Sequence, residues 1–363
     1  MLSLFHRLRD NVMGRGEAAI TIPIFDGALK PNNSLEEATV VGELAAPEDL
    51  VAKDGIVYVA DGCRIVSTTG ADWTVVATFD RPITALACLP GGSFAAALDG
   101  REVRLVGGPL DGRSYSSARG RPFCAVNGLC AMGDGSLVVS DGSAEYPFAQ
   151  WSHDLMTKGR TGRIVLLDLA DGRAKELADG RLYAFGVSTF GDQVWFSETW
   201  KHRVVAVNVS DGKSSIVVDE LPGYPCRLAP ASDGGAWLSV FAGRTQLVEF
   251  VLREPGYRRR MVAEVDPKYW IAPALSSGRT FLEPLQGAGV KMRGVLKPWA
   301  PPRSYGLVVK LSPAGHAEYS FHSRLGGTNH GVVATAECGG FLFVLSKGSR
   351  RILKLKVPVG EAL

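Results

Sequence analysis

Short apolar runs of strand length alternate with glycine-containing turns along most of this chain. Each repeating unit consists of an apolar run, a tight turn, a second apolar run and a polar turn. The central pair of a unit, such as Asp54-Gly55 or Asp134-Gly135, can supply the positive φ angles that a tight β-hairpin requires. Six such units begin at Glu48, Ile83, Asn127, Phe185, Cys226 and His330, and the unit at Ile83 is the weakest copy.

Most of these hairpins continue into a third strand and often into a fourth. Examples are residues 162–169 followed by AKEL, 203–209 followed by SSIVV, and 306–312 followed by AEYSF. Four antiparallel strands repeated about six times are typical of a β-propeller, whereas the long helical patterns of a TIM barrel do not occur. The sequence therefore predicts an all-β, six-bladed β-propeller with four-stranded antiparallel blades.

Departures from the repeat define the predicted organisation of the chain. Residues 1–37 are expected to form a short amphipathic helix and the segment that leads into the propeller, because apolar residues recur at helical spacing between Leu2 and Val12. Residues 38–363 form the predicted propeller. Insertions at about 145–160 and 253–304, the second in the fifth blade, are expected to cap one face and to wall a pocket.

Composition narrows the classes of function and location. Hydrophobic residues make up 46% of the chain and the net charge is only +3, so a large core is expected and a nucleic-acid partner is not. No apolar run approaches the roughly 18 residues of a membrane span. The six cysteines have no zinc-ligand spacing and are expected to be thiols in a reducing compartment. We therefore predict a cytoplasmic protein that binds a small molecule; the sequence leaves its oligomeric state open.

Several segments, taken in order, resemble the strictosidine synthase-like proteins. They are NGLCAMGDGSLVVSDGS from Asn127, the TGR-led strand from Thr161, the SETWKHRVVAVNV stretch, LPGYPCRLAPASDGGAWLSV, and YGLVVKLSPAGHAEYSFH. The resemblance extends from about Phe25 to Leu355. It implies a six-bladed propeller with its active site at the central channel. It also implies a relationship to the gluconolactonase and paraoxonase-type lactonases, which hold calcium or another divalent ion there.

The resemblance also indicates where such a metal ion would be held. Glu48 and Asn127 match oxygen-ligand positions of the lactonases, but Phe185 stands where an Asn would be, and Cys226-Arg227 stands where an Asp-Asn pair would be. A hard divalent ion needs several converging oxygen ligands, and a guanidinium would repel it. We therefore expect no metal and no other cofactor, with a divalent metal such as calcium as the alternative.

The predicted channel residues suggest acid/base chemistry instead. His330 is a candidate general base, and Glu48 is a candidate to orient it or to carry the proton itself. Cys226 is a candidate nucleophile if a neighbour lowers its pKa. The remaining candidates are for substrate binding: Asn127, Phe185, Arg227 as an anion anchor, and Tyr146 and Trp151 from the first insertion.

Structural roles remain open for the same residues: Cys226 as a buried small side chain, Arg227 as the ion-pair partner of Glu48, and His330 as a turn cap. The plant strictosidine synthases use a Glu in the last blades for an iminium condensation, and no Glu occupies that position in GGTNHGVVATAECGG. The favoured hypothesis is a metal-independent enzyme for condensation, elimination or hydrolysis of a small molecule. The alternatives are a metal-dependent lactonase or esterase and a non-catalytic ligand-binding propeller.

Overall fold

The computed structural model describes residues 22–69, 72–133, 135–275, 305–324 and 327–358, together with the backbone of 290–292 and 295–297. The amphipathic helix predicted between Leu2 and Val12 lies outside these residues, as do Asp134 and much of the second insertion.

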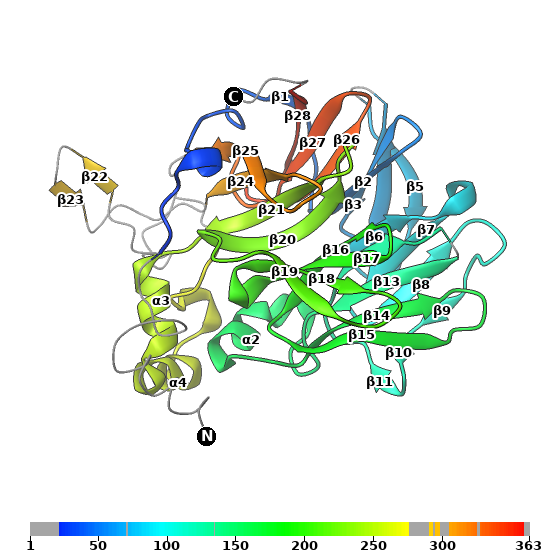
Figure 1. Ribbon diagram of the computed structural model, residues 1–363, viewed down its shortest axis with the longest axis horizontal. Coiled ribbons are helices and arrows are strands. Elements are labelled where there is room, and N and C mark those ends of the chain that lie inside the picture. Colours follow the sequence, from blue (N-terminus) through cyan, green and yellow to red (C-terminus); the bar gives the residue numbers. More distant parts are fainter. Residues whose placement is uncertain are drawn as a thin grey trace.

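Six four-stranded antiparallel sheets confirm the predicted propeller (Figure 1). Blade 1 contains β2 (Pro47–Lys53), β3 (Ile56–Asp61), β4 (Arg64–Thr68) and β5 (Thr74–Thr78). Blade 2 contains β6 (Ile83–Cys88), β7 (Phe94–Leu98), β8 (Glu102–Val106) and β9 (Ser114–Tyr115). Blade 3 contains β12 (Val126–Ala131), β13 (Ser136–Asp141), β14 (Gly162–Asp168) and β15 (Ala174–Arg181).

The second half of the ring follows the same order. Blade 4 contains β16 (Ala184–Phe190), β17 (Gln193–Glu198), β18 (Arg203–Asn208) and β19 (Ser214–Val218). Blade 5 contains β20 (Gly223–Pro230), β21 (Ala236–Gly243), β24 (Gly306–Leu311) and β25 (Ala317–Ser323). Blade 6 contains β26 (Val332–Cys338), β27 (Phe341–Ser346), β28 (Arg351–Lys356) and, from the other end of the chain, β1 (Thr39–Glu43).

The ring closes in two ways. Each inner strand contacts the next one along the chain, and β26 contacts β2, so the inner strands surround a central axis. In blade 6 the outer strand β1 pairs antiparallel with β28, with Thr39 opposite Lys354 and Glu43 opposite Arg351. This pairing joins segments from the two ends of the propeller in one sheet, and it covers the edge that β28 would otherwise expose.

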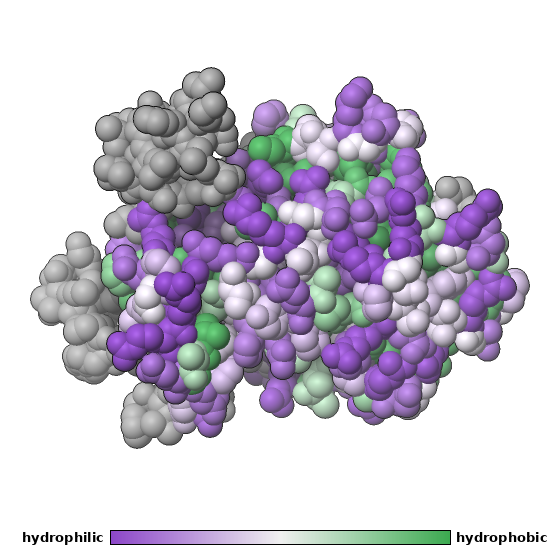
Figure 2. Space-filling model, turned by 90° about the horizontal axis from the view of Figure 1, so that it is seen from below, coloured by the Kyte–Doolittle hydropathy of each residue, from purple (hydrophilic) through white to green (hydrophobic). Residues whose placement is uncertain are grey.

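Local turn chemistry forms the hairpins as the sequence predicts. Asp54 and Gly55 have φ angles of 51° and 81°, and they connect Lys53 to its partner Ile56. Between the blades the apolar faces of neighbouring sheets are buried against each other, and the face shown in Figure 2 is mainly hydrophilic with apolar residues in small groups. Two short two-stranded sheets lie outside the blades. They pair β10 (Ser117–Ala118) with β11 (Arg121–Pro122), and β22 (Val290–Met292) with β23 (Val295–Lys297).

Helices from the two insertions lie together at one side of the propeller (Figure 1). They share a small apolar core that includes Leu155, Met156, Val251, Met261 and Trp270. The insertion between β13 and β14 contains η4 (Phe148–Gln150) and α2 (Trp151–Thr157). The segment between β21 and β24 contains α3 (Gln246–Arg253), α4 (Pro255–Glu264) and η6 (Pro267–Tyr269).

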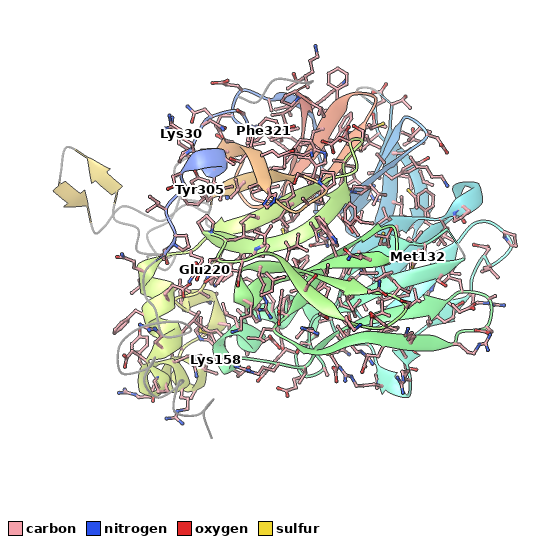
Figure 3. All side chains as sticks on the ribbon, in the orientation of Figure 1. Lys30, Met132, Lys158, Glu220, Tyr305 and Phe321 are labelled. Carbon is pink, nitrogen blue, oxygen red and sulfur yellow. The ribbon has the colours of Figure 1, made fainter. Side chains whose placement is uncertain are left out.

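The segment that precedes the propeller packs on blade 5. Its short helix η2 (Gly27–Leu29) lies beside β25, and Ser320 Oγ donates a hydrogen bond to the Ala28 carbonyl at 2.7 Å. Phe25 stacks on Tyr305 with ring centroids 5.1 Å apart. Figure 3 shows Lys30 of this segment close to Tyr305 and Phe321 of blade 5.

An acid–arginine clasp recurs at the start of three blades. The carboxylate at the end of the second strand accepts a backbone N–H from the segment that enters the blade, and it pairs with an arginine at or near the start of the third strand. In blade 3, Asp141 accepts from Ala125 at 2.9 Å and pairs with Arg163 at 3.1 Å, and both side chains are 1% exposed. The other clasps are Asp61 with Arg64 and Glu198 with Arg203.

We expect Asp141→Ala to lower the free energy of unfolding by about 3–5 kcal/mol, because the substitution leaves the Arg163 charge buried without its partner. Chemical denaturation monitored by tryptophan fluorescence measures the effect. The control Asp171→Ala, on an exposed turn, should change stability by no more than about 0.5 kcal/mol. Equal losses in both variants would contradict the proposed role of the clasp.

A buried histidine should make the fold sensitive to acid. Burial lowers the pKa of His202 to about 3, and the nearby Arg244 acts in the same direction. In the unfolded chain this side chain titrates near 6.5, so its contribution to stability is fully present above that pH and is lost as the pH falls towards 3. The loss can reach about 1.4 kcal/mol per pH unit.

We therefore expect His202→Gln to flatten the dependence of unfolding free energy on pH between about 6.5 and 4. Urea titrations at several pH values would measure the slope. The matched control is His316→Gln at an exposed position, which should keep the wild-type slope. An unchanged slope in the His202 variant would show that this histidine does not hold a depressed pKa.

Candidate functional site

One arginine side chain crosses the central axis of the propeller. Arg227, on β20, donates from Nη1 to the Glu48 carbonyl at 2.8 Å and from Nη2 to the Thr84 carbonyl at 2.6 Å. Nη1 also lies 3.4 Å from the Val333 carbonyl. The Arg227 side chain is only 7% exposed. It thereby joins blade 5 to blades 1, 2 and 6.

Two adjacent carboxylates of β2 face this guanidinium. Glu48 Oε1 lies 3.6 Å from Nη2, and Asp49 Oδ1 lies 3.1 Å from Nε, a charge contact without good hydrogen-bond alignment. Asp49 also accepts the N–H groups of Leu50 and Leu86, each at 2.8 Å. Burial raises the pKa of Asp49 to about 6, although Arg227 and both N–H groups favour its charged form. The arginine therefore faces the carboxyl groups of both Glu48 and Asp49.

A cavity of about 310 Å³, hereafter the aromatic pocket, lies on one side of Arg227. At its wall Lys347 Nζ forms an ion pair with Glu48 Oε2. Glu48 thus has one cationic partner on each carboxylate oxygen. The other residues that line the pocket are Phe148, Ala149, Trp151, Tyr183, Phe185, Thr199, Trp200, Cys226, Phe241, Leu275 and Val333.

The first insertion supplies one wall of the aromatic pocket. Trp151, at the start of α2, packs edge-on against Phe241 of β21 with ring centroids 5.6 Å apart. Trp200, in η5 (Thr199–Lys201), stacks on Tyr183 at 4.6 Å and donates through Nε1 to Asp154 Oδ1 of α2 at 2.8 Å. These contacts hold the insertion of blade 3 against blades 4 and 5.

The Tyr183 hydroxyl is an available hydrogen-bond donor in this wall. Tyr183 is 1% exposed, and its hydroxyl has no hydrogen-bond partner among the described residues. Burial raises its pKa well above the usual value, so the group stays protonated. A buried polar group without a partner is unfavourable unless a ligand or water satisfies it.

A second cavity, of about 290 Å³, lies on the other side of Arg227 and is lined by the inner strands of all six blades. Along β2 and β20, consecutive residues line the two cavities: Glu48 and Cys226 line the aromatic pocket, and Asp49 and Arg227 line the second cavity. Arg227 and its carboxylates therefore lie at the boundary between them. The guanidinium carbon of Arg227 lies over the ring of Phe185, 5.1 Å from its centroid.

The structure brings together four of the residues singled out from the sequence. Glu48, Trp151, Phe185 and Cys226 all line the aromatic pocket. The Cys226 thiol, however, lies 3.2 Å from the Ser239 carbonyl, and burial raises its pKa to about 12. It is a protonated, buried thiol, which argues against the predicted role as a nucleophile.

The other four predicted residues do not line this pocket. The His330 ring packs behind the turn that carries Lys347, where a Cβ added to Gly348 would lie 2.4 Å from its Nδ1. Asn127 donates through its amide to the Ala184 carbonyl at 2.7 Å, which ties β12 to β16. Tyr146 stacks on His153 at 5.7 Å. The donor groups of Arg227 are directed at protein oxygens, which leaves little capacity to anchor a substrate anion.

Sequence reasoning missed Lys347, Tyr183 and Trp200. Lys347 follows the second strand of the last blade, and nothing in its local sequence distinguishes it from other exposed lysines at strand ends. Trp200 lies in the SETW stretch, where the sequence offered only a strand-end position. The pocket appears only when blades 1, 3, 4, 5 and 6 meet.

Comparison with known proteins was made on sequence and on fold. No protein-family model matches the chain. An adipocyte plasma membrane-associated protein from Salmo salar is 27% identical over 362 residues, covering 92% of this chain and 81% of the relative. The protein Strictosidine Synthase-Like 6 of Arabidopsis thaliana is 27% identical over 158 residues, covering 43% of this chain and 42% of that protein. The predicted resemblance to the strictosidine synthase-like proteins is confirmed.

The fold comparison agrees. The chain is similar to a gluconolactonase from Xanthomonas campestris with a TM-score of 0.56 and 12% identity, covering 88% of this chain and 89% of that structure. At this identity the similarity concerns the fold. An enzyme therefore occurs among the solved propellers whose fold this chain shares.

The prediction of a cytoplasmic location is wrong by these comparisons. Relatives from Salmo salar, Danio rerio, Bos taurus and Homo sapiens are all named adipocyte plasma membrane-associated protein, which points to membrane association. The prediction rested on the six free cysteines and on the lack of a long apolar run. Cysteines concern redox conditions, and a protein can attach to a membrane surface without spanning it. Among the described helices, none has the length and apolar composition needed to cross a bilayer.

The residues at the axis do not fit a divalent metal ion. The oxygens that would face such an ion, two carboxylates and three strand carbonyls, face the Arg227 guanidinium. Within the described chain, no group of three or more His, Cys, Asp or Glu side chains has the geometry to hold a metal.

Proposed function

We propose that this protein is a small-molecule enzyme that performs acid/base chemistry in the aromatic pocket without a metal ion. The observation that carries the proposal is the Glu48–Lys347 ion pair in the wall of an otherwise largely aromatic cavity. Charged groups are expensive to bury and are concentrated where function requires them. The similarity to strictosidine synthase-like proteins and the gluconolactonase fold supports an enzyme of this general kind.

The lining of the pocket suggests the class of substrate. Six aromatic side chains would contact a flat, apolar body of modest size, and the volume of about 310 Å³ is at the lower end for a ligand site. The polar side-chain groups of the lining residues are those of Glu48, Lys347, Thr199, Cys226 and Tyr183 and the indole N–H groups of Trp151 and Trp200. We infer a substrate with an apolar or aromatic body and a single polar reacting group, such as an ester or lactone carbonyl.

The arrangement divides the chemical work among three side chains. Glu48 accepts a proton from water or from the substrate and returns it, with Arg227 and Lys347 fixing the carboxylate oxygens. Lys347 and the Tyr183 hydroxyl stabilise negative charge that develops on the reacting oxygen. Arg227 acts through Glu48 as a positioning residue, in place of the anion-anchor role predicted from the sequence.

We expect Glu48→Gln to lower turnover by roughly 10²-fold or more, because the amide cannot accept the proton. Turnover is measured on a panel of aryl esters, lactones and amine- or carboxylate-bearing aromatic compounds. Glu264→Gln, an exposed substitution of the same type on α4, is the control and should keep wild-type rates. Wild-type rates in the Glu48 variant would contradict the proposal that this residue performs acid/base catalysis.

His330→Gln distinguishes the two candidate proton carriers. Since His330 packs behind the Lys347 turn and does not line the pocket, we expect this variant to lower turnover by less than about 10-fold. Its pH profile should keep the wild-type shape. A loss as large as that of Glu48→Gln, with an altered pH profile, would instead assign the proton transfer to His330.

Chelation tests the alternative of a metal-dependent lactonase or esterase. We expect turnover in EDTA to equal turnover in added calcium, because the oxygens at the axis already face Arg227. Loss of activity in EDTA that calcium restores would favour the metal-dependent alternative. Saturable binding of panel compounds without any turnover would instead favour a non-catalytic ligand-binding propeller.

A further inference from the structure

The axis of this propeller concentrates oxygen atoms around the Arg227 guanidinium, and Lys347 pairs with the other carboxylate oxygen of Glu48. The inner strands contribute the carbonyls of Glu48, Thr84 and Val333, and β2 also contributes the carboxylates of Glu48 and Asp49. Without a cation these groups would face one another in a buried space, which is electrostatically unfavourable.

The guanidinium is also the group that spans the ring. In the cyclic order of the inner strands, β20 lies opposite β6, and Arg227 reaches across to the β6 carbonyl of Thr84 at 2.6 Å. On the way it contacts β2 and β26, and Phe185 of β16 lies 5.1 Å from it. One side chain of blade 5 therefore touches the inner strands of blades 1, 2, 4 and 6.

We propose that the Arg227 guanidinium is the resident cation of the axis, and that it takes the structural role that a bound divalent ion could fill in the same oxygen cage. It pairs with two carboxylates, of which Glu48 is also paired with Lys347, and it cross-links inner strands. Charge compensation and cross-linking are the two effects that an oxygen-coordinated ion has in a protein. The proposal goes beyond the enzymatic function and does not depend on it, since its test measures stability and ion binding.

The proposal has a specific consequence for a truncated side chain. Arg227→Ala leaves two carboxylates and three strand carbonyls around a vacant space of the size of the lost side chain. Oxygen-only ligands with two negative charges are a suitable set for calcium. The variant should therefore acquire an affinity for calcium that the wild-type protein lacks.

Arg163 provides a matched control at a second buried position. It is 1% exposed, pairs with Asp141 and donates to the carbonyls of Ala118, Arg121 and Pro122. Its surroundings contain one carboxylate instead of two, and it lies in the clasp of blade 3 away from the axis. Arg163→Ala should be destabilised by loss of a buried ion pair without acquiring a calcium response.

The experiment compares thermal unfolding of the wild-type protein, Arg227→Ala and Arg163→Ala in EDTA, in millimolar calcium chloride and in millimolar methylguanidinium chloride. We expect both variants to melt several degrees below wild type in EDTA. Calcium should raise the melting temperature of Arg227→Ala by about 3 °C or more, and should change wild type and Arg163→Ala by less than about 1 °C. Isothermal titration should then give one calcium site per chain in Arg227→Ala alone.

The remaining outcomes also decide the question. In one of them, methylguanidinium stabilises Arg227→Ala where calcium does not. That result would show that the axis requires the planar hydrogen-bonding group, and it would overturn the proposal that a divalent ion can take the structural role of Arg227. An equal calcium response in Arg163→Ala would overturn the assignment to the axis. If Arg227→Ala aggregates, the yield of refolded protein is measured instead, with and without calcium. The same measurement is made on Arg227→Gln. No gain in yield for either variant would overturn the proposal.

Discussion

The contact between Arg227 and the oxygens of the axis is the interaction on which the centre of this molecule depends. A closed ring of sheets brings the starts of its inner strands together, and here those starts carry Glu48 and Asp49. Buried carboxylates are tolerated when they are paired and hydrogen-bonded. A guanidinium meets this requirement well, because its planar array of N–H groups can reach several acceptors in different directions.

The same interaction shapes the candidate site. Arg227 marks the boundary between two cavities and engages one oxygen of Glu48, and Lys347 engages the other. The carboxylate is held in place at the wall of the aromatic pocket, which is the preorganisation that an acid/base group needs. The proposed chemistry would thus be coupled to stability through Glu48, since this side chain contacts Arg227 at the axis and also lines the pocket.

The first insertion, between β13 and β14, supplies part of the wall of the aromatic pocket. It supplies Phe148 and Trp151 to the pocket, and its buried Asp154 binds the indole of Trp200 in the next blade. The pocket wall therefore depends on contacts between elements of blades 3 and 4 that the repeat does not contain. Insertions of this kind can change the pocket while the ring of blades stays the same.

The repeat could be predicted from the sequence, because hairpin turns such as Asp54-Gly55 and apolar runs of strand length depend only on residues that are close together in the chain. The placement of Phe185, Cys226 and Arg227 on inner strands could be predicted from the sequence as well. The pairing of β1 with β28, the Glu48–Lys347 ion pair and the buried Tyr183 hydroxyl could not, since each joins residues that only ring closure or blade packing brings together. His330 shows the same limit: its position in the repeat suggested the channel, but the turn at Gly348 holds its ring behind the Lys347 loop. Local sequence determined the strands and turns, whereas the identity of each side chain's partners was decided by the tertiary structure, because it depends on distances across the ring.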